Sequence, residues 1–266
     1  MAKLNLDYYT AKDHYSDGDI ENTLLEMARE GKSFQDLPEE EVSFPMVYHF
    51  SDLRENILNW YPLKKTDSVL EIGAGCGAIT GMLCQKAGKV TSVELSRRRA
   101  EINFARNSEK ENLTIMVGNL NDMTFPENFD YVVVNGVLEY AMSFTEGKTP
   151  YETFLKEMGG YLKPEGKLLI AIENRLGLKY FAGAPEDHTD IHFFGIDGYP
   201  ENHSVRTFSK EELGELLKNS GFPFLHFYYP YPDYKFPTEI FTDESLYTNS
   251  YGRNYPVYTD KTAALF

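Results

Sequence analysis

The stretch Val69-Leu70-Glu71-Ile72-Gly73-Ala74-Gly75-Cys76-Gly77-Ala78-Ile79-Thr80 decides the fold. An apolar run that carries one acid leads into a turn of alternating glycines, and helix-forming residues follow directly. Glycines suit such a turn because the backbone bends sharply and a ligand can approach main-chain atoms without meeting a Cβ. The stretch therefore predicts a strand, a ligand-binding turn and a helix, which together open an α/β sheet.

The alternation of short apolar runs with helical segments continues beyond this turn. It is typical of βαβ units, in which parallel strands carry helices on both faces. A turn is expected at Pro164-Glu165-Gly166. The sequence predicts an α/β protein with a Rossmann-like, doubly wound, mostly parallel sheet. The expected strands are 69–72, 90–93, 113–117, 131–134 and 167–172, and the expected helices are 78–87, 97–107 and 151–162.

Residues 1–62 precede this pattern and are predicted to form an N-terminal helical cap. One helix is expected to be capped by Asp19 and ended by Gly31, and a second is expected to run from Ser51 to Pro62. The Rossmann-like domain is expected over 63–235. An aromatic-rich C-terminal segment, 236–266, follows it and can lead into a further domain of a longer protein.

An insertion over 173–208 interrupts the alternation. It is rich in glycine, histidine, aspartate and aromatic residues, and loops of this length in compact domains are commonly functional. Ser209 and Glu212 then form a capping box that opens a late helix, which Gly221 is expected to end. A further strand is expected over 222–229. We expect the acceptor side of the site in the insertion.

Charge and composition exclude several classes of protein. The 41 acidic and 26 basic residues leave a net charge of −15, which argues against binding to nucleic acid or to an anionic membrane. No apolar stretch approaches the roughly 20 residues that span a bilayer, and the N-terminus has no signal-peptide pattern. Cys76 and Cys84 form neither a disulfide framework nor a metal-ligand spacing. The sequence predicts a cytoplasmic protein with no metal.

An acid at the end of the second predicted strand points to a nucleoside cofactor. Glu94 comes 21 residues after Gly73, where a carboxylate can accept hydrogen bonds from ribose hydroxyls. Dinucleotide sites favour G-x-G-x-x-G, whereas the third glycine here comes one position early. Glu71 is unfavourable beside a diphosphate and suits a cation. These features favour S-adenosylmethionine, and a nicotinamide dinucleotide remains the alternative.

Several motifs, in the same order along residues 68–230, resemble the class I S-adenosylmethionine-dependent methyltransferases. They are the glycine turn, the ribose acid, the segment 118–122, the segment 135–140 after the fourth strand, and the turn 162–166. Asn119 stands where the family commonly has an acid beside the adenine, which leaves its role open. The resemblance implies S-adenosylmethionine as cofactor. The residues that it assigns to the cofactor are Glu71, Gly73, Ala74, Gly75, Gly77, Glu94, Leu95, Asn119, Leu120 and Asn135.

A narrower resemblance lies outside this core. Residues 48–57, 173–180 and 184–188 are similar to methyltransferase modules of bacterial surface-polysaccharide gene clusters, which accompany glycosyltransferases or are fused to them. The resemblance implies a carbohydrate acceptor and a glycosyltransferase partner. Tyr48 and Arg54 could close over the cofactor from the N-terminal helix, or simply pack there.

Methyl transfer to a hydroxyl requires a base that takes the proton. His188, in Glu186-Asp187-His188, is the first candidate because a neighbouring carboxylate can orient the imidazole. His49, His192 and His203 compete with it. Glu139 is either a base or an acid that stabilises the first turn of a helix. Arg175 and Lys179 either bind an acidic acceptor or are solvated charges on a helix. The residues expected to bind the acceptor are Glu139, Asn174, Arg175, Lys179, Tyr180 and His192.

The sequence therefore predicts an S-adenosylmethionine-dependent enzyme that methylates a carbohydrate or other small molecule at oxygen. Two alternatives remain at this point. One is a nicotinamide-dependent oxidoreductase, and the other is a non-catalytic module that binds S-adenosylmethionine and supports a partner enzyme.

Overall fold

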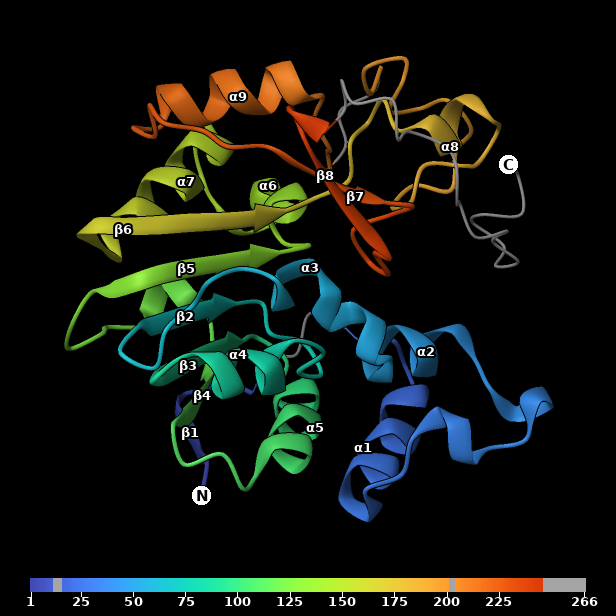
Figure 1. The fold of residues 1–266 in the computed structure, drawn as a ribbon, viewed down its shortest axis with the longest axis vertical. Coiled ribbons are helices and arrows are strands. Elements are labelled where there is room, and N and C mark those ends of the chain that lie inside the picture. Colours follow the sequence, from blue (N-terminus) through green and yellow to red (C-terminus); the bar gives the residue numbers. More distant parts are fainter. Residues whose placement is uncertain (12–15, 201–203, 246–266) are drawn as a thin grey trace. The chain divides into compact units, whose positions relative to one another are not determined.

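The computed structural model describes residues 1–11, 16–200 and 204–245 (Figure 1). The chain divides into two compact units. Unit 1 consists of Met1–Asn135 and Gly160–Ile170, and unit 2 consists of Gly136–Gly159 and the chain from Ala171 onwards. Residues 246–266 of the predicted C-terminal segment lie outside the described residues.

Unit 1 is built on a six-stranded sheet with the strand order β1-β4-β3-β2-β5-β6. The pairs β1–β4, β4–β3, β3–β2 and β2–β5 are all parallel. From β2 the chain adds β3 and β4 on one side and returns to β5 on the other, so the order reverses at β2. This arrangement confirms the predicted fold class. The strands are β1 (Lys3–Tyr8), β2 (Ser68–Ile72), β3 (Lys89–Glu94), β4 (Leu113–Gly118), β5 (Phe129–Asn135) and β6 (Leu162–Ala171).

Burial on both faces explains why the central strands read as nearly continuous apolar runs. All five residues of β2 are buried, and so are Val132, Val133 and Val134 of β5. Parallel strands need this composition because their crossover helices take both faces away from water. Glu71 is the exception within β2.

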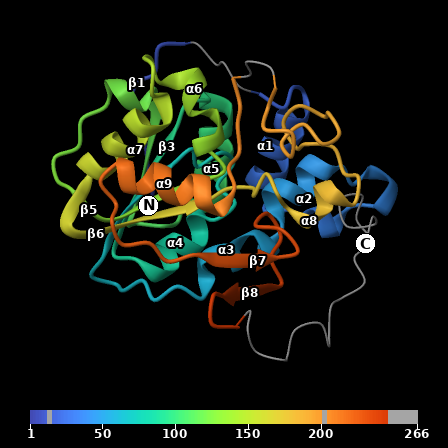
Figure 2. The same ribbon diagram turned by 90° about the horizontal axis from the view of Figure 1, so that it is seen from above.

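The N-terminal helices and the helices after β2 and β3 complete unit 1. Gly31 ends α1 in the left-handed conformation, as predicted. Figures 1 and 2 both place α1 and α2 beyond the ends to which the strand arrows of unit 1 point. The helices are α1 (Ile20–Glu30), α2 (Phe44–Phe50), α3 (Asn56–Asn59), α4 (Thr80–Lys86) and α5 (Arg97–Asn107), with 3-10 turns η1 (Phe34–Asp36), η2 (Glu39–Glu41), η3 (Asp52–Glu55) and η4 (Leu120–Asp122).

The structure differs from the sequence prediction at the N-terminus. The segment predicted as a purely helical cap also contributes β1, an edge strand paired with β4. The Asp19 side chain caps no backbone N–H among the described residues. Instead, Glu21 accepts hydrogen bonds from the backbone N–H of Asp17 and the hydroxyl of Ser16. The helix predicted from Ser51 to Pro62 is divided into η3 and α3.

The turn predicted at Pro164-Glu165-Gly166 is also wrong, because these residues lie inside β6. Since β6 is an edge strand of the sheet, the missing N–H of Pro164 can face away from the ladder. Gly166 is required by close packing, because a Cβ there would lie 2.9 Å from the carbonyl oxygen of Phe129.

Unit 2 consists of short helices, a late helix and a two-stranded sheet. The capping box of Ser209 and Glu212 forms as predicted. The strand predicted over 222–229 is shorter and later, and it pairs with β8 in an antiparallel hairpin. The elements are η5 (Leu138–Tyr140), α6 (Ala141–Phe144), α7 (Pro150–Gly160), α8 (Leu178–Phe181), α9 (Lys210–Asn219), β7 (Tyr228–Tyr231) and β8 (Glu239–Thr242).

Among the described residues, no helix combines the length and the apolar character that a membrane crossing requires.

An ion-pair cluster ties α1 to α5. The guanidinium of Arg99 lies 2.8 Å from Oε1 of Glu21 and 2.6 Å from Oδ2 of Asp17. The same Asp17 oxygen lies 2.9 Å from Nε2 of His49. Arg99 and Glu21 are buried, so their charges depend on each other for compensation.

We predict that Arg99→Leu lowers the free energy of unfolding by about 3 kcal/mol, because it leaves two carboxylates without their cation. Arg97→Leu on the same helix is the matched control. Its exposed pair with Glu101 contributes about 0.5 kcal/mol or less. Urea titration measures both losses, and equal losses for the two variants would contradict the prediction.

Candidate functional site

The carboxyl ends of four neighbouring strands bring most of the predicted cofactor residues to one edge of the sheet in unit 1. The order β4-β3-β2-β5 sets Asn119, Glu94, the glycine turn and Asn135 side by side. In open α/β sheets, ligands bind outside this edge, where the strand order reverses. The reversal at β2 falls on the glycine turn itself.

The glycine turn has the backbone that the sequence predicts. Gly73, Gly75 and Gly77 have φ values of 66°, 54° and 78°, in the left-handed region that favours glycine. A Cβ on Gly77 would lie 2.3 Å from Oδ1 of Asn103, so the helix behind the turn packs directly against it. A Cβ on Gly75 would meet no described atom within 4 Å. The face at Gly75 is therefore open to a ligand.

A buried hydrogen-bond network lies beneath the turn. Oε2 of Glu71 accepts hydrogen bonds from the hydroxyls of Thr80, at 2.7 Å, and Ser92, at 2.6 Å. Nδ2 of Asn103 donates to the Thr80 hydroxyl, and Nδ2 of Asn107 donates to Oδ1 of Asn103. Burial raises the pKa of Glu71 to about 7, although the two hydroxyls oppose that shift. Glu71 therefore joins β2, β3, α4 and α5.

Glu94 holds the turn from the next strand. One of its carboxylate oxygens accepts a hydrogen bond from the backbone N–H of Gly75 at 2.7 Å, and the other accepts from Ser96 at 2.8 Å. Burial raises the pKa of Glu94 despite these bonds. Leu95, which follows it, is half-buried. The carboxylate thus already contacts the main chain that the ligand is expected to approach.

The remaining strand ends carry two asparagines. Oδ1 of Asn119 accepts a hydrogen bond from the N–H of Asn121 and so caps η4, which begins with half-buried Leu120. Oδ1 of Asn135 is buried and has no hydrogen-bond partner among the described residues. A buried carbonyl without a donor is costly, so it suits a donor on a bound molecule.

The N-terminal helices contribute packing more clearly than catalysis. The Arg54 guanidinium stacks 4.2 Å from the centre of the Tyr48 ring, and Arg54 is buried. His49, one of the competing bases, is buried against Asp17, and burial lowers its pKa. His49 is therefore part of the α1 ion-pair cluster rather than a free base.

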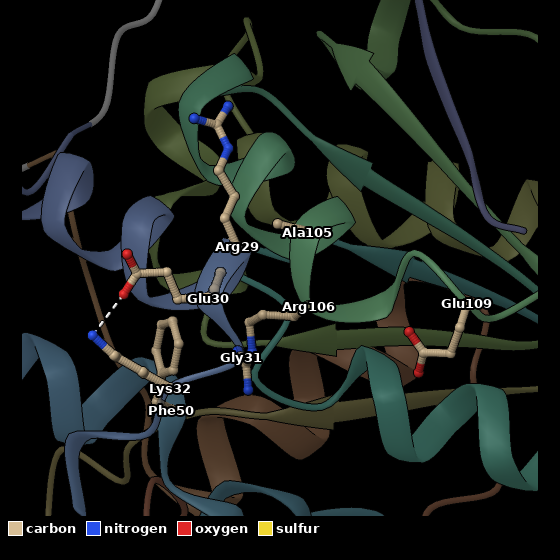
Figure 3. Close-up of a pocket in the computed structure, with 9 residues that line it drawn as sticks. Arg29, Glu30, Gly31, Lys32, Phe50, Ala105, Arg106 and Glu109 are labelled. Atoms are coloured by element: carbon tan, nitrogen blue, oxygen red, sulfur yellow. Dashed lines mark ion pairs between the residues drawn. The ribbon is translucent and has the colours of Figure 1, made fainter. Parts of the chain in front are cut away.

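A pocket of about 520 Å³ opens elsewhere on unit 1, between the end of α1 and α5 (Figure 3). Gly31, Phe50 and Arg106 are among the residues that line it. Arg106 also donates to the carbonyl oxygen of Cys76 at 2.8 Å, and so braces the glycine turn. None of the residues predicted for the cofactor or the acceptor lines this pocket.

Unit 2 gathers three buried glutamates and a half-buried histidine, which we call the His188 cluster: Glu139, Glu173, Glu186 and His188. Nδ1 of His188 lies 3.0 Å from Oε1 of Glu186. Nε2 of the same ring lies 3.7 Å from Oε1 of Glu139 and 4.0 Å from Oε2 of Glu173. Glu139 follows β5 by four residues in the chain, and Glu173 follows β6 by two.

The carboxylates of the His188 cluster set its protonation. Burial by itself lowers the pKa of His188, but Glu139, Glu186 and Glu173 outweigh it and raise that pKa to about 10. Burial raises the pKa of Glu186, yet hydrogen bonds from His188 and its charge bring that pKa down to about 2. Burial raises the pKa of Glu139. The carboxylates therefore favour the imidazolium form of His188, which is the first candidate base in the sequence.

Asp187 is held by two lysines rather than by His188, and one of them, Lys235, also pairs with Glu173 of the His188 cluster. The Asp187 carboxylate lies 2.8 Å from Nζ of Lys179 and 3.2 Å from Nζ of Lys235, and it accepts a hydrogen bond from the Tyr180 hydroxyl. Lys179 also pairs with Asp233 at 2.8 Å. Glu186 is the carboxylate that contacts the imidazole, while Lys179 and Tyr180 are held by Asp187.

Other predicted acceptor residues have structural partners. Arg175 forms a two-pronged ion pair with Glu212 of the α9 capping box, at 2.6 and 3.2 Å, so it is neither a free clamp nor a solvated charge. Oδ1 of Asn174 accepts from the N–H of Leu176. His192 is exposed, and its ring bonds to the carbonyl oxygen of Gly183. His203 lies outside the described residues.

Sequence reasoning missed part of both centres. Thr80 and Ser92 are polar residues in otherwise apolar buried elements. This contrast was the sequence signal that could have identified them as partners of Glu71. Glu173 follows a predicted strand but was not assigned a role. Lys235, which pairs with Glu173, comes 62 residues later and carries no local signal.

The comparisons with known proteins show similarity to methyltransferases over part of the chain. Residues 70–170 match the family described as Methyltransferase domain. The chain is 26% identical over 156 residues to the malonyl-[acyl-carrier protein] O-methyltransferase of Priestia megaterium, covering 58% of this chain and 46% of the relative. It is 42% identical over 81 residues to a ribosomal RNA small subunit methyltransferase A of Methanosarcina mazei, covering 30% and 29%. The chain thus spans less than half the length of these two relatives.

A solved structure supports the fold. The complex of the Haloferax volcanii Trm112 methyltransferase activator with a methyltransferase has a TM-score of 0.50 and 16% identity, and covers 78% of this chain and 77% of that chain. Residues 70–170 are therefore similar to a methyltransferase domain, the fold is that of a solved methyltransferase complex, and the cofactor of such domains is S-adenosylmethionine. The open face at Gly75 and the unpaired Oδ1 of Asn135 fit such a ligand.

We predict that Glu71→Gln gains stability relative to the wild type as pH rises. The unfolded carboxyl ionises near its usual pKa of 4.5 and the folded one near 7, so the wild type loses stability across that interval, by up to about 3 kcal/mol. Urea titrations at about pH 5 and about pH 8 measure the change. Parallel stability curves for the two proteins would show that Glu71 is already ionised in the fold.

Proposed function

We propose that this protein transfers the methyl group of S-adenosylmethionine to a hydroxyl oxygen of a carbohydrate or other small molecule. The observation that supports oxygen as the target is the His188 cluster. A hydroxyl must lose its proton when it is methylated, and a buried group of three carboxylates and an imidazole can exchange protons. When bound, S-adenosylmethionine supplies an electrophilic methyl on a sulfonium sulfur.

In this proposal the chain's own residues bind and orient the cofactor. Glu94 accepts hydrogen bonds from the ribose hydroxyls, Asn119 meets the adenine edge, and Asn135 accepts a hydrogen bond from the cofactor through its unpaired oxygen. Tyr48 and Arg54 form the wall on the side of the N-terminal helices. The glycine turn permits close approach because it carries no Cβ there.

On the acceptor side, the His188 cluster as a whole is the proposed catalytic centre, rather than His188 alone. Glu186 is a positioning residue that fixes the imidazole. Asp187, with Lys179 and Tyr180, supports the segment that carries His188. Exposed Asn174 and His192 remain proposed acceptor contacts, whereas the ion pair of Arg175 favours a structural role.

A carbohydrate is the acceptor that the chemistry favours. The net charge of −15 opposes binding to a polyanion, although one relative is named a ribosomal RNA methyltransferase. The aromatic residues of the insertion and of β7 offer faces on which a sugar ring can stack. The resemblance over residues 48–57, 173–180 and 184–188 adds surface-polysaccharide synthesis, with a glycosyltransferase as partner or as a further domain.

A cytoplasmic location completes the proposal. Cys76 and Cys84 are both buried free thiols, as expected in a reducing compartment.

We predict that Glu94→Gln weakens the binding of S-adenosylmethionine by about 1.5 to 3 kcal/mol, because a charge-assisted hydrogen bond to the ribose is lost. Glu101→Gln, on the surface of α5, is the matched control. Isothermal titration calorimetry measures both affinities. Unchanged affinity in Glu94→Gln would remove Glu94 from the ribose site.

The activity itself is tested with isotopically labelled S-adenosylmethionine and a panel of sugars, nucleotide sugars and oligosaccharides. We expect label on a hydroxyl oxygen of one of these acceptors. We also expect His188→Gln to lower kcat by at least about 100-fold, while Glu101→Gln leaves it unchanged. Cofactor binding without transfer to any acceptor would identify a non-catalytic module. Label on nitrogen or on RNA would overturn the proposed acceptor.

A further inference from the structure

We propose that Glu139, Glu173 and His188 bind a divalent transition-metal ion. Each residue offers one ligand atom, and the three atoms all lie within 4.8 Å of one another. Ligand atoms around one such ion lie roughly 3 to 3.5 Å apart, as bond lengths of about 2.1 Å require. The observed separations of 3.7 and 4.0 Å from Nε2 of His188 need only a small inward movement.

Two buried carboxylate oxygens that accept no hydrogen bond distinguish this cluster from an ordinary group of acids. Glu139 is 1% exposed and Glu173 is 4% exposed. Oε2 of Glu139 and Oε2 of Glu173 are buried and have no hydrogen-bond partner among the described residues. Burying a carboxylate oxygen without a donor is costly, and a cation between the two carboxylates removes that cost.

The surrounding side chains orient the ligand atoms as metal sites require. Nδ1 of His188 lies 3.0 Å from Oε1 of Glu186, and Nε2, on the other side of the ring, faces Glu139 and Glu173. This carboxylate–histidine arrangement is the one that supports metal-bound imidazoles. Lys235 pairs with Oε1 of Glu173 and leaves Oε2 for the ion. Tyr199 in turn donates to Glu186.

The chemical nature of the three ligand atoms indicates which metal ions can bind. One imidazole nitrogen and two carboxylate oxygens suit Mn²⁺, Fe²⁺ or Zn²⁺ better than Mg²⁺, which prefers oxygen alone. The sequence carries no sign of this site, because its ligands lie far apart in the chain.

A role for the ion rests on the proposed function. A metal that binds the acceptor hydroxyl lowers its pKa, so the O–H bond breaks and the proton passes to water. The oxygen lone pair then forms the bond to the methyl carbon. The bond from that carbon to sulfur breaks, and its electron pair stays on sulfur, which becomes a neutral thioether.

Calorimetry on the chelator-treated full chain, without S-adenosylmethionine, tests the site with Mn²⁺, Zn²⁺ and Mg²⁺. We expect one Mn²⁺ or Zn²⁺ per chain and weaker binding of Mg²⁺. Glu173→Gln and His188→Gln should each weaken binding at least about tenfold, the loss that even a partner of a ligand causes. His192→Gln, with an exposed histidine in the same segment, should bind as the wild type does.

A second measurement covers variants that fail to fold. Binding should raise the melting temperature of the wild type, and chelator should reverse the rise. Absence of saturable binding, or loss of binding in His192→Gln alone, would overturn the inference. Methyl transfer that persists in chelator would overturn the role of the ion in the reaction but leave the proposed function. Metal binding without methyl transfer would support the site and remove the function.

Discussion

The buried carboxylate of Glu71 is the constraint on which unit 1 depends. A carboxylate inside a parallel sheet must be hydrogen-bonded, and the hydroxyls of Thr80 and Ser92 supply those bonds from α4 and β3. Asn103 extends the network into α5 and leaves room only for glycine at position 77. The same bonds therefore fix strand neighbours, helix packing and the shape of the glycine turn, which we propose binds the cofactor. The buried carboxylate specifies the structure of this site because few other arrangements of strands and helices would supply its hydrogen bonds.

We propose different roles for the two units. Unit 1 offers main-chain groups and neutral or anionic side chains, which suit a cation that carries no phosphate. Unit 2 offers the His188 cluster, in which carboxylates hold a proton on an imidazole. This proton makes His188 alone a poor base near neutral pH, and it explains why we assign the reaction to the cluster. A bound metal ion would use the same excess of negative charge.

Much of the fold could be predicted because local signals and tertiary structure agree there. Local residues alone determine three predicted features. They are the strand before Gly73, the carboxylate of Glu94 at a strand end, and the capping box at Ser209. The prediction was wrong where the tertiary structure decides. Pro164 suggests a turn, yet an edge strand accommodates it. Arg175 could have been a free clamp, but Glu212 holds it across 37 residues of sequence. The His188 cluster likewise depends on contacts between segments that no spacing rule relates.

The most direct test of the account is a calorimetric titration of the wild-type protein with S-adenosylmethionine and, separately, with NADH. The open glycine turn, buried Glu71 and the carboxylate of Glu94 predict saturable binding of one S-adenosylmethionine per chain and no binding of NADH. Binding of NADH without binding of S-adenosylmethionine would contradict the account, because the same sheet edge would then hold a diphosphate beside two buried acids.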